Sequence, residues 1–417
     1  MSHREKTINQ LSIGLLAVPL FLGVSTCALA TNGILPLGNG MTAHGLGGAG
    51  IANPSDAMAA ADNPALLAET GDQIAAGLTL FAPHRAADIG NGYVDSDKNL
   101  FPIPMFGWTK TLNPKMNTGV VVTAMGGMNT TYPAALLGTD FGMDLSGLII
   151  APTFSYAPSQ GVAYGVSALL GYEKLTTTLP TSPGASTSFD TTDSATGTGL
   201  KVGVTYQFSE NTQLGAFYQS RIKMGQMDKH CTEPTGAFYG AVSQGIQCEL
   251  NLAPITGVGF KLDVTDSGKL VMDLMHIAWS KVELFKRAFG WGDQNVFKFG
   301  YEYKMNAGLT LRYGVNFGKS PLNSEYIHLP GPVNDGSQDG LGGVMAPAVS
   351  ERHYTFGFTK KMGQNELVGY YAFIPKVEQT DPGNYALPNG SGGTYGGGAG
   401  NRVKMYQHAI GFGFNWK

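Results

Sequence analysis

The chain of 417 residues contains few charged side chains and no basic cluster. Asp, Glu, Lys and Arg together make up 14% of it, well below the roughly 25% of an average soluble domain, although the length would suit two such domains. The formal net charge is −3. Without clustered lysine or arginine, nothing in the sequence indicates a nucleic-acid partner.

Long apolar runs are also missing after the first 30 residues. No later stretch of about 18 uncharged apolar residues occurs, and the mean hydropathy of −0.03 is too low for a bundle of membrane-spanning helices. The sequence is instead rich in glycine, with 59 residues, and in tyrosine and phenylalanine, with 18 and 21. Low charge, abundant glycine and aromatics, and no spanning helix are typical of exported β-structure.

Residues 1–30 predict a secretory signal peptide. A basic start precedes an apolar run over residues 11–26, and residues 28–30 (Ala-Leu-Ala) form a small-x-small cleavage site. The run is too short for a comfortable spanning helix. Processing as a lipoprotein before Cys27 is the alternative.

Only two cysteines, Cys231 and Cys248, follow the signal peptide. An even pair in an oxidising, exported compartment predicts a disulfide. It would close a loop of about 17 residues and contribute roughly 3 kcal/mol in the chain-entropy treatment. A zinc site formed with His230 is the alternative, but it lacks a fourth ligand.

The region from residue 161 to residue 174 alternates strictly. Every second residue from Val162 to Tyr172 is apolar, and the other positions carry mainly small or polar side chains. A period of two with one wholly apolar face predicts a β-strand in apolar surroundings. The same pattern recurs over residues 200–208 and 309–317.

Aromatic residues cluster at both ends of these alternating segments, and charges fall on the opposite parity. Two aromatic belts around an aliphatic band predict a barrel wall in lipid, where a lysine or arginine facing the middle of the bilayer would cost about 2–4 kcal/mol. The expected belts contain Tyr156, Tyr206, Phe208 and Tyr303 at one end, and Tyr172 and Trp279 at the other. The side chains expected to face the lumen include Lys201, Lys298, Glu302 and Arg312.

The sequence therefore predicts an all-β, transmembrane antiparallel barrel of about fourteen strands over residues 73–417. Short turns alternate with long loops, as in outer-membrane barrels, whose short turns lie on the periplasmic side. The expected strands are 73–83, 101–111, 116–127, 146–157, 161–173, 197–208, 212–224, 254–265, 268–280, 295–305, 308–319, 351–362, 365–376 and 403–416.

Residues 31–72 do not alternate and consist mainly of small residues. Gly45, Gly47 and Gly50 match the G-x-G-x-x-G pattern, but no strand precedes them, as dinucleotide binding requires. A fourteen-stranded barrel would leak unless something filled it, because eight strands fill themselves and sixteen leave a channel. Residues 31–72 are therefore expected to form an N-terminal hatch (plug) inside the lumen, with the glycines allowing tight backbone folding.

The hatch region resembles that of the FadL family, the long-chain fatty acid outer-membrane transporters. The resemblance rests on Asn63-Pro64-Ala65 within "GLGGAGIANPSDAMAAADNPALLA", and on residues 276–285, 309–321 and the final strand. One departure is Lys417, which follows Trp416 where such barrels usually end on an aromatic residue.

This resemblance implies passive uptake of hydrophobic compounds, either long-chain fatty acids or hydrocarbons. External loops would capture the ligand, the barrel would bind it, and it would leave sideways after hatch movement through a gap at an inward kink of the third strand. The matching strand is 116–129, in which Gly126 and Gly127 provide a kink or else simply begin the external loop.

Apolar residues of inward parity, among them Phe217, Met275 and Ile277, suggest a pocket for an apolar ligand, with packing against the hatch as the alternative. Arg312, Lys298 or Lys201 would meet a carboxylate or pair with nearby acids. Loop 225–253 offers apolar contacts or simply caps the barrel. The candidate ligand-binding and gating residues are Asn63, Pro64, Ala65, Gly126, Gly127, Phe217, Phe238, Met275, Ile277 and Arg312.

No enzyme, cofactor or metal is expected. Asp95, Asp97 and Asn99 resemble the start of a calcium loop, but the glycine and final acid that such a loop needs are absent.

A gated porin for small polar solutes is the alternative function, and a membrane-embedded hydrolase ranks third because no G-x-S-x-G elbow is present. The expected partners are a hydrophobic small molecule, outer-membrane lipid and lipopolysaccharide, and the barrel-assembly machinery, with the chain itself a monomer.

Overall fold

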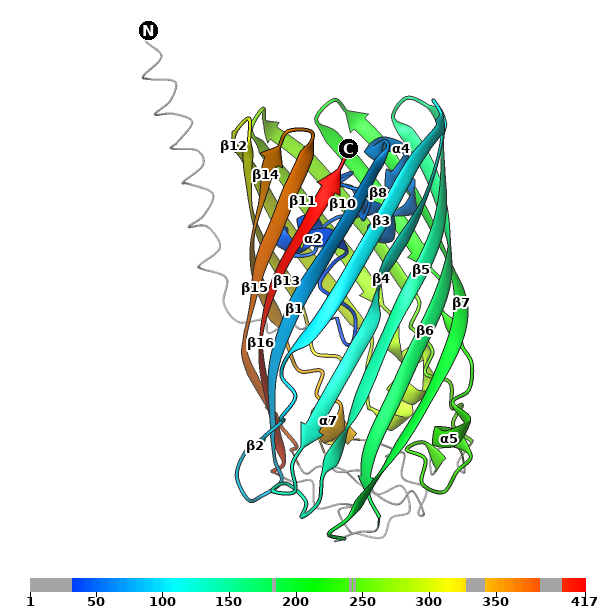
Figure 1. The fold of residues 1–417 in the computed structure, drawn as a ribbon, viewed down its shortest axis with the longest axis vertical. Helices are drawn as coiled ribbons and strands as arrows, with labels where there is room; N and C mark the ends of the chain where they lie inside the picture. The colour runs from blue at the N-terminus through cyan, green and yellow to red at the C-terminus, as the bar shows by residue number, and fades with distance from the viewer. Residues whose placement is uncertain (1–31, 182–184, 240–241, 243–244, 328–341, 383–399) are drawn as a thin grey trace.

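The structure is a computed structural model that describes residues 32–181, 185–239, 242, 245–327, 342–382 and 400–417 (Figure 1). The expected signal peptide, residues 1–30, lies outside the described residues. None of the described helices combines the length and apolar character that crossing a membrane requires.

Antiparallel strands close into a barrel, as the sequence predicts (Figure 1). Sequential neighbours pair around the wall, and β16 pairs with β1 to complete it. Two of the sixteen described strands, β2 (Val94–Asp95) and β9 (Lys223–Met224), span two residues each and lie off the wall. The other fourteen form the wall: β1 (Gln73–Asp88), β3 (Phe101–Asn113), β4 (Met116–Tyr132), β5 (Phe141–Ser159), β6 (Val162–Pro180), β7 (Ser188–Ser209), β8 (Thr212–Gln219), β10 (Ile255–Thr265), β11 (Gly268–Ile277), β12 (Gln294–Asn306), β13 (Leu309–Gly318), β14 (Arg352–Met362), β15 (Asn365–Thr380) and β16 (Arg402–Trp416).

Burial alternates along the wall strands as the sequence pattern requires. On β6, Tyr164 and Leu170 are exposed on the outer surface, whereas Leu169 faces inward and is buried. The lysines, glutamate and arginine predicted to face the lumen (Lys201, Lys298, Glu302 and Arg312) are all buried. The outer surface is thus an apolar band, and the polar side chains lie inside.

Strands β4 to β7 extend beyond the predicted limits at the end that carries the long loops. The alternating apolar pattern stops near residue 173 on β6 and starts near 197 on β7, yet pairing continues to Pro180 and Ser188. Threonine side chains link these extensions, with Thr176 and Thr192 hydroxyls 2.9 Å apart. The backbone ladder needs no apolar face, and threonine favours strands, so the wall continues beyond the apolar band toward the long loops.

Trp279 was predicted in an aromatic belt, and that prediction is wrong. β11 ends at Ile277, and Trp279 begins a short 3-10 helix, η3 (Trp279–Lys281), where it is 0% exposed. Once the strand has ended, a period of two no longer determines which side a residue faces. The other predicted belt residues, Tyr156, Tyr172, Tyr206, Phe208 and Tyr303, are exposed on the outer surface.

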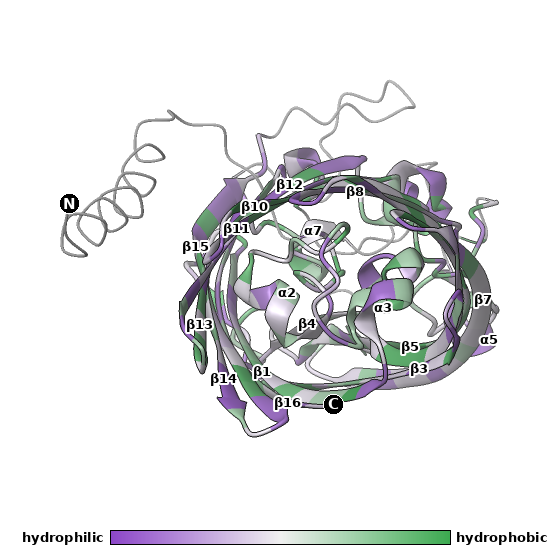
Figure 2. Cartoon of the chain, turned by 90° about the horizontal axis from the view of Figure 1, so that it is seen from above, coloured by the Kyte–Doolittle hydropathy of each residue, from purple (hydrophilic) through white to green (hydrophobic). Residues whose placement is uncertain are grey.

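Residues 32–72, here called the N-terminal segment, lie inside the barrel (Figure 2). The segment contains α2 (Gly40–Gly45), α3 (Ala59–Asp62), the 3-10 helix η2 (Pro64–Leu66) and α4 (Leu67–Thr70). Helix α2 contacts β13 to β16 and β1, while η2 contacts β5, β6 and β7. The segment is mostly buried and touches opposite sides of the wall.

The long-loop end, at the bottom of Figure 1, carries part of an apolar cluster that continues into the lumen as far as Phe217 and Ile51. Its short helices are α5 (Asp228–Cys231), η3, the π-helix η4 (Leu284–Ala288), η5 (Ser324–Tyr326) and α7 (Gly342–Met345). Trp279, Phe285 and Trp291 form its aromatic centre, with ring centroids 4.8 to 5.3 Å apart. The short turns and the C-terminus lie at the opposite end.

Candidate functional site

A cavity of about 80 Å³ lies in the lumen between the N-terminal segment and the wall. Its apolar lining comes from Leu35, Ile51, Met125, Ile149, Phe217 and Met275, and its charged lining from Asp62, Lys201, Asp273 and Lys298. An engineered cavity of about 150 Å³ takes up benzene, so this space is too small for a hydrophobic molecule of that size. The structure therefore shows a closed arrangement of the lumen.

Charged wall residues hold the backbone of the N-terminal segment. The Asp273 carboxylate accepts hydrogen bonds from the backbone N–H of Gly50 at 2.8 Å and of Ile51 at 3.2 Å. Lys298 Nζ donates to the carbonyl oxygen of Gly48 at 3.0 Å. These hydrogen bonds are buried, so a donor or acceptor that lost its partner without reaching water would destabilise the docked segment by about 1–3 kcal/mol.

Lys201, on β7, holds a second point of the segment. Its ammonium donates to the carbonyl oxygen of Ala61 at 2.6 Å and lies 4.1 Å from the centroid of the Phe217 ring. Asp62 follows Ala61 and accepts a hydrogen bond from Asn39 at 2.8 Å. Burial raises the pKa of Asp62 to about 6, against the opposing effects of Lys298 and of the Asn39 hydrogen bond.

The Asn63-Pro64-Ala65 triplet lies directly against the wall at β6 and β7. The Asn63 amide donates to the carbonyl oxygens of Ile51 at 2.9 Å and of Val204 at 3.1 Å. A Cβ on Gly203 would lie 1.9 Å from Asn63 Oδ1, and one on Gly165 would lie 2.2 Å from the Pro64 carbonyl carbon. Only glycine in the wall permits this contact, so the triplet fits a recess that its own sequence does not reveal.

The backbone ladder between β3 and β4 is interrupted. Pairing runs from Asn113↔Met116 to Phe106↔Val122 and stops there, although β3 continues to pair with β1 as far as Phe101↔Phe81. Residues 123–130 of β4 therefore have no partner on β3 among the described residues. Beyond them, the Asp97 N–H donates to the Thr131 carbonyl oxygen at 2.8 Å and closes the interruption at the long-loop end.

Two prolines explain why the ladder stops. Pro102 and Pro104 occupy alternate positions of β3, and neither has an N–H to donate. Residues two apart point their backbone groups to the same edge of a strand, so the same edge loses both donors. Since pairing to β1 continues through both positions, the weakened edge is the one that faces β4.

The interruption begins in the outer part of the apolar band. On β5, the outward side chains Leu148 and Ile150 are apolar and exposed, whereas Asp144 and Ser146 further along are polar. Leu148 pairs with Ala124, the second unpaired residue of β4. Part of the interruption thus lies within the apolar outer band of the barrel wall.

Gly126 forms a bulge within the unpaired part of β4. The register to β5 shifts between Ala124 and Gly126, and Gly126 has φ +141°, a conformation that L-residues rarely adopt. The N–H of Gly127 donates to the carbonyl oxygen of Ile34 at 3.1 Å. The bulge therefore touches the beginning of the N-terminal segment.

The turn over residues 32–35 joins three regions. Asn32 and Leu35 line the cavity, and the Ile34 carbonyl contacts the β4 bulge. A Cβ on Gly33 would lie 2.7 Å from the Trp279 ring and 2.8 Å from the Trp291 ring. Displacement of this turn would disturb the cavity, the bulge and the aromatic cluster together.

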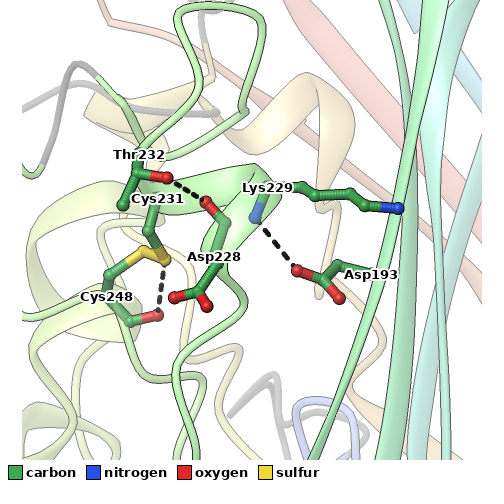
Figure 3. Close-up of a disulfide and its surroundings, with 6 residues drawn as sticks. All are labelled: Asp193, Asp228, Lys229, Cys231, Thr232 and Cys248. Carbon is green, nitrogen blue, oxygen red and sulfur yellow. Dashed lines mark hydrogen bonds between the residues drawn. A yellow bond between two sulfur atoms is a disulfide. The ribbon is translucent and has the colours of Figure 1, made fainter.

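A disulfide joins Cys231 and Cys248, with Cα atoms 6.0 Å apart (Figure 3). The loop is tied to the wall because the backbone N–H of Lys229 donates to the Asp193 carboxylate at 3.0 Å. Phe238 is buried in the apolar cluster beside His230, with ring centroids 6.0 Å apart. Phe238 thus belongs to the long-loop end and is not among the residues that line the cavity.

The structure brings together some of the candidate residues and separates others. Phe217 and Met275 line the cavity, and Gly126 follows Met125, which also lines it. Ile277 is buried in the apolar cluster. Arg312 lies elsewhere in the lumen, where its Nε donates to Glu302 at 2.7 Å, as the ion-pair alternative anticipated.

Met125 and the interrupted β3 edge were missed in the sequence. Met125 has the same parity as the buried residues Asn117 and Val121 of the predicted third strand, so strand parity was the available signal for it. Pro102 and Pro104 were the available signal for the interruption, because two prolines of one parity mark a strand edge that cannot pair fully.

Solved structures share this fold. A Pseudomonas aeruginosa FadL homologue is 13% identical and matches with a TM-score of 0.66, covering 94% of this chain and 99% of its own. The Pseudomonas putida toluene transporter TodX is 18% identical, with a TM-score of 0.65 and coverage of 92% and 99%. The Ralstonia pickettii toluene transporter TbuX is 16% identical, with a TM-score of 0.62 and coverage of 91% and 98%.

A family model also matches the sequence. The outer membrane protein transport family (OMPP1/FadL/TodX) matches residues 37–345, which is about three quarters of the chain. The match includes most of the N-terminal segment and the strands through β13. A comparison with curated proteins finds no match.

Proposed function

We propose a transport route for hydrophobic compounds from the premise that the chain belongs to the outer membrane protein transport family (OMPP1/FadL/TodX). The protein is accordingly an outer-membrane β-barrel of a family of transport proteins. The cargo class is a small apolar compound, either a monoaromatic hydrocarbon or a fatty acid. Two of the solved structures with this fold are toluene transporters, which supports the first.

The first step is capture at the long-loop end, which faces the outside of the cell. A hydrophobic compound that binds to the apolar cluster there leaves water. The burial is favourable by about 25 cal/mol for each Å² of apolar surface removed from water. Phe238 and the disulfide between Cys231 and Cys248 belong to this region. The loop therefore offers a firm apolar contact rather than a mobile one.

The second step is displacement of part of the N-terminal segment, which acts as a hatch. The cavity of about 80 Å³ cannot hold the cargo until neighbouring residues move. The turn over residues 32–35 is the part whose movement enlarges the cavity, because Asn32 and Leu35 form its wall. Asn63 and Asp273 hold the rest of the segment in place.

The third step is sideways release between β3 and β4. The observation that carries this proposal is that the cavity touches the wall at Ala124 and Met125, where β4 has no partner on β3. Few backbone hydrogen bonds need to break there, because the ladder already stops at Phe106↔Val122. A molecule leaving at this point passes from the cavity into the apolar surroundings of the barrel.

A cross-link across the interruption tests the route. Extending the register past Phe106↔Val122 would bring Pro104 opposite Ala124, so an oxidised Pro104→Cys/Ala124→Cys pair would fasten the two strands. Uptake of radiolabelled toluene and of a radiolabelled long-chain fatty acid is measured in cells that lack the wild-type gene. For whichever compound the wild-type protein transports, uptake is expected to fall at least tenfold when this cysteine pair is oxidised and to recover when it is reduced.

The matched control is Leu311→Cys/Phe358→Cys, a pair of neighbours on the continuous β13–β14 ladder. Oxidation of this pair leaves uptake unchanged, and wild type treated identically accounts for effects on the native disulfide. Normal uptake with the β3–β4 pair cross-linked would eliminate the lateral route. Steady ion conductance of the purified protein in planar bilayers, without hydrophobic uptake, would instead favour the gated porin.

No residue arrangement described above supports catalysis as the function. The family consists of transport proteins. We therefore infer that the protein works by binding and release and is not an enzyme. Hydrolysis of a lipid substrate by the purified protein, lost on substitution of one serine and one histidine, would contradict this inference.

A further inference from the structure

Glu173 is a buried acid without a partner. It lies on the inward face of β6 and is 0% exposed, and neither carboxylate oxygen has a hydrogen-bond partner among the described residues. Burying a carboxyl group without a partner is costly. Other inward acids have partners, since Glu302 pairs with Arg312 and Asp273 accepts from Gly50.

The inward side chains around Glu173 are small or apolar. Its cross-strand neighbours are Gly147 and Ala195, which have the smallest side chains available. A Cβ on Gly171, two residues away on the same face, would lie 3.3 Å from both Ile222 and Met224. The carboxyl group thus stands among small and apolar residues rather than among charges.

Met125 connects this place with the cavity. Its side chain lines the cavity, and a Cβ on Gly147, the neighbour of Glu173, would lie 2.8 Å from Met125 Cε. Methionine is unbranched and changes rotamer at little cost. A change of the Met125 rotamer would therefore extend the cavity toward Glu173.

The long-loop end lies directly beyond Glu173. His230 of α5 has Nε2 3.2 Å from the carbonyl oxygen of Leu175, two residues further along β6. His230 precedes Cys231 of the disulfide. Glu173 consequently lies between the cavity, which Met125 lines, and the loop that carries the disulfide.

We propose that Glu173 binds the hydroxyl group of an apolar phenol or alcohol, whose apolar body lies toward Met125 and the cavity. This rests on the proposed transport function and narrows its cargo. A hydroxyl group both donates and accepts, and so does a carboxyl group in its neutral form. A hydrocarbon would leave the Glu173 carboxyl group without a hydrogen-bond partner. A carboxylate cargo would place a second acid beside Glu173, which has no paired cation among the described residues.

Toluene and 4-methylphenol form a matched pair of probes, because they differ only by the hydroxyl group. The purified full-length protein is titrated with each, and uptake of each is measured in cells. Glu173→Leu is expected to weaken 4-methylphenol binding about tenfold, the effect of one lost hydrogen bond, and to leave toluene binding within twofold. Glu173→Gln keeps most of the 4-methylphenol affinity because an amide also donates and accepts.

Ser167→Ala is the control variant. Ser167 lies on the same inward face of β6, is buried, and has its partner in Thr153 at 2.7 Å, so its loss leaves the preference between the two probes unchanged. Equal weakening of both probes by Glu173→Leu, or no change in either, would overturn this inference. Failure of wild type to take up either probe would instead overturn the transport function itself.

Discussion

Substitution of Gly126 is the sharpest test of the strand bulge. We predict that Gly126→Val reduces uptake of hydrophobic compounds by more than tenfold while the barrel still assembles. Gly126 has φ +141°, which costs an L-residue about 1–3 kcal/mol. A Cβ at this position would also lie 2.7 Å from the carbonyl oxygen of Ile34, closer than any ordinary contact.

The two effects together define the magnitude. Relieving the contact requires either that Ile34 moves, which breaks the 3.1 Å hydrogen bond from Gly127, or that the bulge flattens. A lost hydrogen bond adds about 0.5–1.5 kcal/mol. The bulged arrangement therefore becomes less favourable by about 1.5–4.5 kcal/mol, which corresponds to a shift of roughly 10- to 2,000-fold in its population.

The assay compares uptake with assembly. Uptake of radiolabelled cargo is measured in cells, and folding is followed by the gel-mobility shift that a folded barrel shows before heating. Gly127→Ala is the matched control, because no positive φ is found at Gly127 and its Cβ would lie 3.2 Å from the Leu145 carbonyl oxygen, a milder contact. Wild-type uptake by a correctly assembled Gly126→Val protein would refute the role of the bulge.

Three further predictions concern the lumen and the loop. Asp273→Ala leaves the N–H groups of Gly50 and Ile51 unpaired at about 1–3 kcal/mol each, so ion conductance in planar bilayers should rise although the barrel remains folded; unchanged conductance would contradict the anchoring role. Burial raises the pKa of Asp62 from 3.8 to about 6, so between these pH values the docked segment binds more protons than the displaced segment. The free energy of docking should therefore weaken by about 3 kcal/mol as pH rises from about 4 to about 6, and it should stay constant above that. Conductance measured against pH should show this trend in wild type and lose it in Asp62→Asn. Cys231→Ser/Cys248→Ser should loosen the loop by roughly 3 kcal/mol, seen as faster proteolysis there, with barrel heat stability unaltered.

The wall of the barrel follows closely from the sequence because its cause is local. Alternation of apolar and polar side chains places the strand near 254–265, and β10 spans Ile255–Thr265. Where the alternation ends, prediction ends too. Trp279 was misplaced two residues past the end of β11, and β7 was begun at residue 197 instead of Ser188.

The interior could be predicted only in outline. The pairing of Asp273 with Gly50 joins residues 223 positions apart, and no local pattern encodes it. The recess at Gly203 is likewise visible only when Asn63 is already placed against it. By contrast, the inward direction of Phe217 and Met275 follows from strand parity, which is why both were found among the candidate residues.

In the proposed route, the height at which the β3–β4 ladder stops sets the thermodynamics of delivery. A compound that leaves beside Ala124 moves from protein to hydrocarbon without crossing a layer of water, so its own oil–water partition supplies the driving force. Such a route needs neither ATP nor a proton gradient, and its net flux reverses once the concentration of the compound in the lipid exceeds its partition equilibrium with the outside. The membrane itself then serves as the sink for the compound.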